Sequence, residues 1–435
     1  MNSLLFLLFF VLLTIPVASR LRRDGNQKII YLWPWKWLVE KIVELSARAR
    51  WDVYADVAIT FAVGPVLAWR FIKHRKPALL SFFGYLLTIF AIVPALGGTT
   101  IFGQSIFGAA FISLFGFGGY ALFLVGLTAY GIILDYITGG QPSPGIAPAL
   151  PGVRIGGIYI PLVEGVVALI IALIVHEGAH GVVAIRERIP VKAGGIITLG
   201  LLPIGAYVEP DETLFRQAGR LSRARVLAAG PMANLVVFFL FTALLLLAFP
   251  VSEHLSAYAC TSSSGVRILD VPKTLDVGGN VIDSPAHGIL MPGDVVLEIN
   301  GSPVNCVSEF FEVLSPVRDA KANVPLDLLI LRGGEELNVS IHTEKGYIGI
   351  VGVENVYESA LPLWYQALAF IISLLSWIAF LNFMVGLVNM LPLPPLDGGH
   401  LYRDLLEEAG MLPAYRILLW LTIAILVINV LPWFV

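Results

Sequence analysis

Long apolar runs alternate with short polar segments over most of this chain. An apolar run of about 20 residues is long enough to cross a bilayer as a helix. Such runs predict membrane-spanning helices near residues 2–19, 53–71, 77–97, 99–117, 119–135, 161–184, 226–249, 363–390 and 412–434. The pattern therefore predicts a polytopic α-helical membrane protein.

One region departs from this pattern. From residue 251 to 362, Gly, Asp, Glu and Ser are frequent, and short alternating runs such as 294–301 and 326–331 are typical of strands. We expect a soluble α+β domain inserted between membrane spans. The predicted parts are an additional amino-terminal membrane region at 1–150, a first part of the membrane core at 151–250, the inserted domain at 251–362 and a second part of the core at 363–435.

Composition agrees with a membrane protein. Of the 435 residues, 57% are hydrophobic and 14% are charged, whereas soluble domains carry roughly 25% charged residues. The formal net charge is -3, and no block of basic residues stands out. We therefore expect a lipid bilayer around the chain and no nucleic-acid partner.

Basic residues indicate the orientation of the core. Arginines and one lysine follow the run at 161–184 and precede the run at 226–249, and the positive-inside rule places them in the cytoplasm. They are Arg186, Arg188, Lys192, Arg216, Arg220, Arg223 and Arg225. The inserted domain would then lie outside the cell.

The amino-terminal topology is less regular. The run at 2–19 has the length of a signal peptide, but it lacks a basic start and is followed by arginines, so we expect an uncleaved anchor. If every run crosses, the basic segment 20–50 falls on the outer side. One run is therefore interfacial, re-entrant or cleaved, and the Trp-rich segment 31–37 suits a membrane surface.

The chemistry of the chain centres on His176-Glu177-Gly178-Ala179-His180, which lies inside an apolar run. Residues four apart share one face of a helix, so both imidazoles can bind one metal ion while Glu177 polarises a bound water. The alternative is a pair of histidines that hydrogen-bond between helices. A carboxylate within hydrocarbon favours the metal site.

A catalytic zinc ion needs a third protein ligand. Asp397 follows an apolar run and three prolines, where a carboxylate is costly unless it is functional or paired. It is equally compatible with a helix cap. The other acids considered are Glu209, Asp211 and Glu212 in a solvated loop, and Asp294 and Glu298 in the inserted domain.

The two cysteines, Cys260 and Cys306, both fall in the inserted domain. In an oxidising exterior they can form a disulfide, and they are as easily independent core residues.

Four segments together resemble the site-2 protease family of intramembrane metalloproteases. They are His176 to His180, Gly205 to Val208 with the acids that follow it, Gly230-Pro231-Met232-Ala233-Asn234, and Asn389 to Gly398 as Asn-x-x-Pro-x-Pro-x-Leu-Asp-Gly. Their order and spacing cover residues 160 to 410. The resemblance implies a site-2-protease-like membrane core.

What the resemblance implies about the site is specific. His176, His180 and Asp397 would bind Zn²⁺, and Glu177 would serve as general base and acid. Asn234 and Asn389 match positions near the catalytic site, where they would hold substrate or stabilise the oxyanion, or else form interhelical hydrogen bonds. The substrate would be a membrane-anchored protein cut within its transmembrane segment, with the active site toward the cytosolic side.

Two further segments fit the family. Residues 191–200 match a membrane-embedded β-like segment, whose exposed edge could pair with an unwound substrate or belong to an ordinary hairpin. Residues 284–301, followed by a short helix at 308–314, resemble a PDZ domain of bacterial members, which implies a prokaryotic cell membrane. Such a domain would bind a peptide by strand addition or exclude bulky substrates.

Two other functions were compared with proteolysis. A zinc transporter or metal sensor also places histidines and a carboxylate in the membrane. A silent scaffold would only present its PDZ-like domain. A Glu between the ligands favours hydrolysis, because neither alternative needs it.

Overall fold

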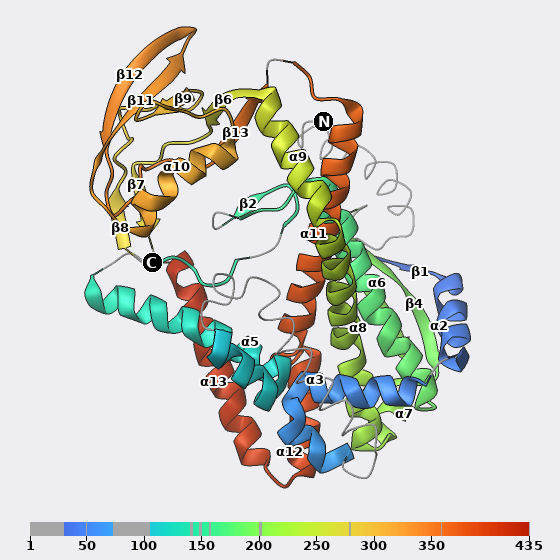
Figure 1. Ribbon diagram of the computed structural model, residues 1–435. Helices are drawn as coiled ribbons and strands as arrows, with labels where there is room; N and C mark the ends of the chain where they lie inside the picture. The colour runs from blue at the N-terminus through green and yellow to red at the C-terminus, as the bar shows by residue number, and fades with distance from the viewer. Residues whose placement is uncertain are drawn as a thin grey trace, which may run out of the picture. The chain divides into compact units, whose positions relative to one another are not determined.

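A computed structural model describes residues 30–48, 50–72, 105–139, 142–147, 150–155, 158–199, 202–277, 280–357 and 359–434 (Figure 1). The chain forms two compact units. Unit 1 consists of Met1–Ala129, Gly145–Ala243 and Leu374–Val435, and unit 2 consists of Tyr130–Pro144 and Leu244–Ser373. The spans predicted at 2–19 and 77–97 lie outside the described residues.

Six helices in the described part of the chain are long and apolar enough to cross a membrane. They are α3 (Trp51–Ile72), α5 (Ser105–Thr138), α6 (Leu162–Arg186), α8 (Arg220–Leu247), α11 (Leu363–Asn389) and α13 (Leu412–Val430). Most of their side chains are apolar on every side, as contact with both lipid and helix neighbours requires. The chain is a multi-pass membrane protein, as its hydrophobic pattern predicts.

One pair of predicted spans, at 99–117 and 119–135, meets close to a break in the structure. Element α5 consists of two helices joined across a kink at Gly116 (φ 69°), and Leu114–Thr138 is its part that is long and apolar enough to cross a membrane. Helix α3 is interrupted in the same way at Gly64 (φ 77°), and a Cβ on Gly116 would collide with the Gly64 backbone. The two breaks thus pack together, and a hydrophobic pattern cannot distinguish such a break from a turn.

A small antiparallel sheet lies in unit 1. Its strands are β1 (Ile30–Pro34), β4 (Val191–Leu199) and β5 (Leu202–Pro210), in the order β1-β4-β5. Helix α2 (Lys36–Arg48) packs through Leu38 and Ile42 against Val182 of α6. The strand predicted within 191–200 is β4, but it lies between β1 and β5. The prediction that this strand offers an open edge is therefore wrong.

The shorter elements complete unit 1. Helix α7 (Glu212–Gln217) precedes α8, α12 (Asp397–Glu408) follows α11, and a 3₁₀ turn η2 (Leu431–Trp433) follows α13. Strands β2 (Arg154–Ile155) and β3 (Ile158–Tyr159) form a hairpin before α6. Helices α6, α8 and α11 run side by side (Figure 1) and share an apolar cluster that includes Ala168, Val237 and Ile378.

Unit 2 contains a sheet of order β12-β11-β9-β6-β13, with β10 paired to β9. Its strands are β6 (Ser263–Ile268), β9 (Val295–Ile299), β10 (Ser302–Pro303), β11 (Pro325–Arg332), β12 (Glu335–His342) and β13 (Val353–Tyr357). Strands β7 (Thr274–Val277) and β8 (Asn280–Asp283) form a separate hairpin. Phe310 of α10 (Val307–Asp319) and strand residues such as Leu328 and Ile330 form one buried core. The α+β region predicted from the sequence is present.

Helix α9 (Phe249–Ser262) joins α8 to this sheet. Its Cys260 forms a disulfide with Cys306, the residue that precedes α10, and their Cα atoms are 4.9 Å apart. Of the two possibilities that the sequence left open, the structure shows the disulfide. The predicted boundaries at 251 and 362 fall close to the starts of α9 and α11.

Candidate metal centre

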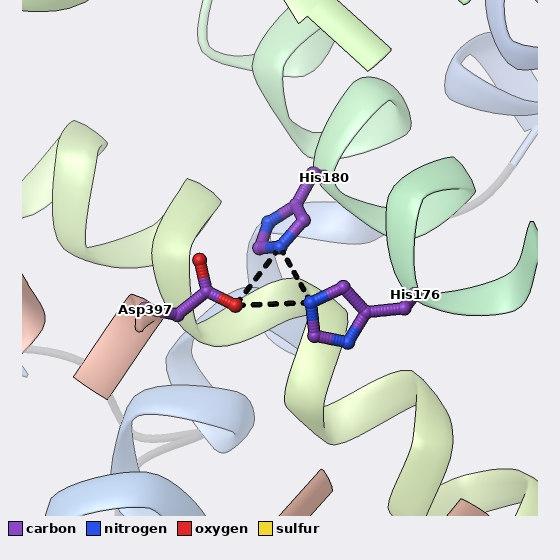
Figure 2. Close-up of side chains that lie close together, drawn as sticks. All are labelled: His176, His180 and Asp397. Atoms are coloured by element: carbon purple, nitrogen blue, oxygen red, sulfur yellow. Dashed lines mark hydrogen bonds and ion pairs between the residues drawn. The ribbon is translucent and has the colours of Figure 1, made fainter. Parts of the chain in front are cut away.

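The two histidines of the motif lie one turn apart on α6. His176 is buried and His180 is half-buried, because α6 is an apolar helix packed between its neighbours. Their Nε2 atoms are 3.1 Å apart and point to the same place (Figure 2). This is the arrangement that the spacing of four residues predicts.

Asp397 lies next to the histidines although it comes from a distant part of the sequence. Helix α11 ends at Asn389, a proline-rich loop follows, and Asp397 is the first residue of α12. The next residues, Gly398 and Gly399, lie so close to the backbone of residues 390–394 that any Cβ there would collide with it. Their lack of side chains lets the first turn of α12 fold back under the loop and bring Asp397 to α6.

The carboxylate of Asp397 completes a triangle of ligand atoms. Its Oδ2 is 3.0 Å from Nε2 of His176 and 3.2 Å from Nε2 of His180 (Figure 2). Its side chain does not cap α12, whose N-cap position is Leu396. The structure thus brings His176, His180 and Asp397 together, as the metal hypothesis requires.

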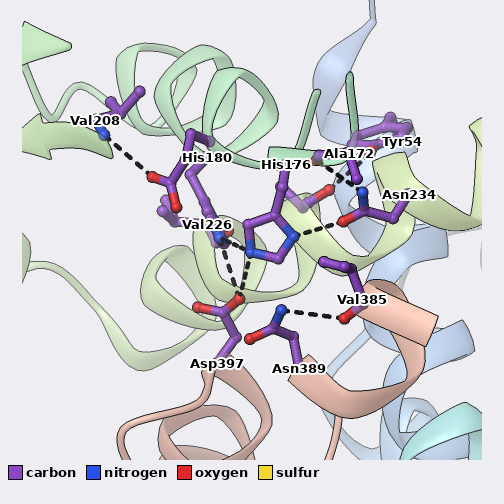
Figure 3. Close-up of polar contacts among 12 residues, drawn as sticks. Tyr54, Ala172, His176, His180, Val208, Val226, Asn234, Val385, Asn389 and Asp397 are labelled. Carbon is purple, nitrogen blue, oxygen red and sulfur yellow. Dashed lines mark hydrogen bonds and ion pairs between the residues drawn. The ribbon is translucent and has the colours of Figure 1, made fainter. Parts of the chain in front are cut away.

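The outer nitrogens of both rings are already engaged. Nδ1 of His176 lies 2.6 Å from Oδ1 of Asn234, and Nδ1 of His180 lies 2.7 Å from the carbonyl oxygen of Val226 (Figure 3). Both partners are acceptors, so this network assigns the proton of each neutral ring to Nδ1. Each Nε2 then presents a lone pair toward the carboxylate, as metal-binding histidines do.

The spacing of these three atoms suits a small divalent cation. Ligand atoms that lie 2.0–2.1 Å from a tetrahedral zinc ion are about 3.3 Å apart, close to the 3.0–3.2 Å observed. Gly230 of α8 faces the same point, and a Cβ there would collide with Nε2 of both histidines. The residues present therefore fit a zinc ion.

Glu177 points away from the triangle to strand β5. Its Oε2 accepts a hydrogen bond of 3.1 Å from the backbone N–H of Val208. The other acids near residue 210 serve elsewhere. Asp211 caps α7 through the N–H of Leu214 and pairs with Lys192, and Glu212 pairs with Arg216. None of these acids is brought to the histidines.

The two asparagines of the motifs differ in their contacts. Asn234 is fully buried and bonds to His176, whereas Nδ2 of Asn389 donates to Val385 in its own helix. Figure 3 shows Asn389 beside Asp397. The motifs did not include a further neighbour, Asn382, which bonds to Asn234. A polar residue in an apolar helix was its one available signal.

These features define a class: a multi-pass membrane protein in which two histidines of one spanning helix, α6, meet an aspartate at the start of α12. The profile of Peptidase family M50 matches residues 164–431. The chain belongs to this family, the site-2 protease family.

Relatives agree with this assignment. An uncharacterized protein of Methanocaldococcus jannaschii is 33% identical over 264 residues, which cover 60% of this chain and 62% of that protein. The chain thus spans less than two thirds of that relative. The chloroplastic membrane metalloprotease ARASP of Arabidopsis thaliana is 22% identical and matches 60% of this chain and 73% of its own length.

Two further matches are partial. A membrane-bound transcription factor site-2 protease homolog of Arabidopsis thaliana is 26% identical, covering 44% of this chain and 34% of its own length. A crystal structure of a PDZ domain from Listeria innocua is 24% identical, covering 22% of this chain and 97% of that domain with a TM-score of 0.15.

Proposed function

We propose that this chain is a zinc-dependent intramembrane endopeptidase that cleaves the transmembrane segments of membrane-anchored proteins. The observation that carries the proposal is the convergence of His176, His180 and Asp397, with the carboxylate of Glu177 on the same turn of α6. The family and the printed names of the relatives, membrane metalloprotease and site-2 protease homolog, support it.

Each residue has a role in this proposal. A zinc ion held by His176, His180 and Asp397 would act as a Lewis acid and lower the pKa of water. Glu177 takes a proton from the attacking water and gives it to the leaving amine. Asn389 holds the substrate backbone or the oxyanion, and Asn234 orients His176.

The substrate must expose a peptide bond. An intact helix shields its carbonyl groups by hydrogen bonding, so the cleaved segment unwinds locally. An extended substrate can then pair with a strand edge. Strand β5 is at one end of the described sheet, and its Val208 already bonds to Glu177, so β5 replaces the β4 edge expected from the sequence.

The placement in the cell is part of the same proposal. Basic residues around α7 support an active site toward the cytosolic side, with residues 251–362 outside. We propose that the membrane is a prokaryotic cell membrane. We assign these residues as a PDZ-like domain, in view of their sheet and helix α10. It binds a peptide by strand addition or excludes bulky substrates.

The first test replaces Glu177 by Gln. Because Glu177 is not one of the three ligands, zinc binding should persist, while cleavage of a membrane-anchored reporter should fall by at least about 10²-fold. The matched control is Glu209→Gln, the same change at an exposed residue of β5. Normal turnover by Glu177→Gln would contradict the assigned role, and zinc transport into vesicles without proteolysis would favour a transporter.

The companion variant is Asp397→Asn. Loss of an anionic ligand should lower the zinc content of the purified protein, measured by mass spectrometry of the metal. Unchanged zinc content would remove Asp397 from the ligand set.

A further inference from the structure

Asn382 has no place in the metal triangle or in any motif of the sequence, yet it is completely buried in the middle of α11. A primary amide in a membrane helix is costly unless its hydrogen bonds are made. Its Nδ2 donates to the carbonyl of Ile378, 2.8 Å away, and its Oδ1 accepts from Nδ2 of Asn234 at 2.9 Å.

Both polar atoms of the Asn234 side chain form hydrogen bonds. Its Nδ2 donates to the carbonyl of Ala172 on α6 and to Asn382 on α11, and both distances are 2.9 Å. Its Oδ1 is therefore left to accept from His176. If the amide rotated by half a turn, its oxygen would face two acceptors and its NH₂ group would face the ring, so the two acceptors fix the orientation.

The orientation of this amide determines the protonation of the ring. With Oδ1 of Asn234 against Nδ1 of His176, the ring carries its proton on Nδ1 and keeps a lone pair on Nε2. We propose that Asn382 is a positioning residue, which holds the Asn234 amide and thereby keeps Nε2 of His176 available for metal. The inference rests on the proposed metal role of His176.

The test measures zinc affinity of the full-length protein in detergent, by competition with a chromophoric chelator. Asn382→Leu keeps the volume of the side chain and removes the acceptor, and it should weaken zinc binding about tenfold or more, as loss of outer partners of metal ligands does. Asn382→Ala provides a second variant without the acceptor if the leucine variant does not fold.

Asn382→Asp should restore the affinity. A carboxyl group in this apolar position is neutral, because an ionised one would have no counter-charge among the described side chains that contact Asn382. Its carbonyl oxygen then accepts from Asn234 and its O–H donates to Ile378, which reproduces both bonds of the asparagine.

The matched control is Asn429→Leu. Asn429 is also fully buried in a spanning helix, donates to a carbonyl four residues earlier, and bonds to another helix through Val125. It lies outside the metal triangle, so its loss should lower thermal stability without changing zinc affinity.

A double variant separates positioning from packing. Asn382 acts through Asn234, so Asn382→Leu combined with Asn234→Ala should bind zinc as weakly as Asn234→Ala alone. Additive losses, or an Asn382→Leu protein that binds zinc like the wild type, would overturn the inference. A wild-type protein that binds no zinc would instead refute the proposed function.

Discussion

Gly230 shows how one missing side chain makes room for a metal ion. It lies on α8 within a buried stretch, and a Cβ at this position would occupy the space that the two Nε2 atoms face. Alanine at this position would stabilise α8 more, since glycine costs a helix about 1 kcal/mol relative to alanine. The glycine is thus explained by the space beside it.

Gly230→Ala should therefore exclude zinc even though alanine favours the helix. We expect a loss of affinity of about 10- to 100-fold, as for other disturbances next to metal ligands, measured by the same chelator competition. Gly131→Ala in α5 is the matched control, because a Cβ there meets no neighbouring atom. Full zinc content in Gly230→Ala would show that the ion lies elsewhere.

For single residues, the sequence predicts those contacts that depend only on local helix geometry. The histidine pair follows from helical periodicity, but Asp397 is 217 residues from His180, and its residue type alone did not distinguish it from a cap. Family resemblance pointed to it. Asn382 was not found, because the partner of a buried amide depends on which helices become neighbours.

At the scale of elements, a network of ion pairs connects α3 to α8 and to the end of α6. Arg225 of α8 is 2.8 Å from Asp56 of α3 and 3.0 Å from Glu187, which directly follows α6. The next residue, Val226, supplies the carbonyl that holds His180. Helix α3 lies outside the matched family region, so the amino-terminal part contributes directly to the support of the centre.

Asp56→Asn should destabilise the protein by about 3 kcal/mol, since removing one partner leaves a buried charge poorly compensated. Thermal unfolding of the detergent-solubilised protein measures the loss. As a control, Glu44→Gln breaks exposed ion pairs within α2 and should cost less than about 1 kcal/mol. Equal effects of the two variants would argue against a structural role for the buried network.

The existence of spanning helices could be predicted because bilayer thickness imposes about 20 apolar residues. The break predicted between 117 and 119 lies close to the kink at Gly116, but the close approach of Gly116 to Gly64 could not be predicted, because it depends on which helices become neighbours. Likewise β4 was expected from the family resemblance, while its position between β1 and β5 arises from pairing with a segment more than 150 residues away.

The molecule as a whole combines units with different stabilising interactions. Unit 1 packs apolar helices against one another, whereas unit 2 has a sheet core. In unit 2 the buried Asp294 is paired with Arg332, which donates to both of its carboxylate oxygens at 2.8 and 2.7 Å. Burial alone would raise the pKa of Asp294, but hydrogen bonds from Arg332 and from the N–H of Met291 lower it below its ordinary value.

Unit 2 should therefore lose stability in acid. Because the folded pKa of Asp294 is the lower one, its contribution is complete above the unfolded pKa of about 3.9. The contribution declines as the pH falls from there through the folded pKa. Asp294→Asn should cost about 1.5–3 kcal/mol at pH 7 and flatten the acid dependence. Calorimetry of the full-length protein from pH 7 to pH 3 measures both, and parallel curves would contradict the prediction.

The division into a membrane core and an inserted α+β region follows from composition, because water and lipid select different residues. The disulfide of Cys260 and Cys306 could not be predicted, since the positions of two cysteines in the sequence carry no information about their separation in space.

The hydrogen bond between Glu177 and Val208 has one more consequence. Val208 lies in β5, at the end of the described sheet, and its N–H points to Glu177 rather than to β4. A peptide that added to β5 at this residue would need the same N–H. The added peptide strand and the carboxylate of Glu177, the proposed general base, would compete for this one donor. Binding of a substrate at β5 would then free the carboxylate of Glu177.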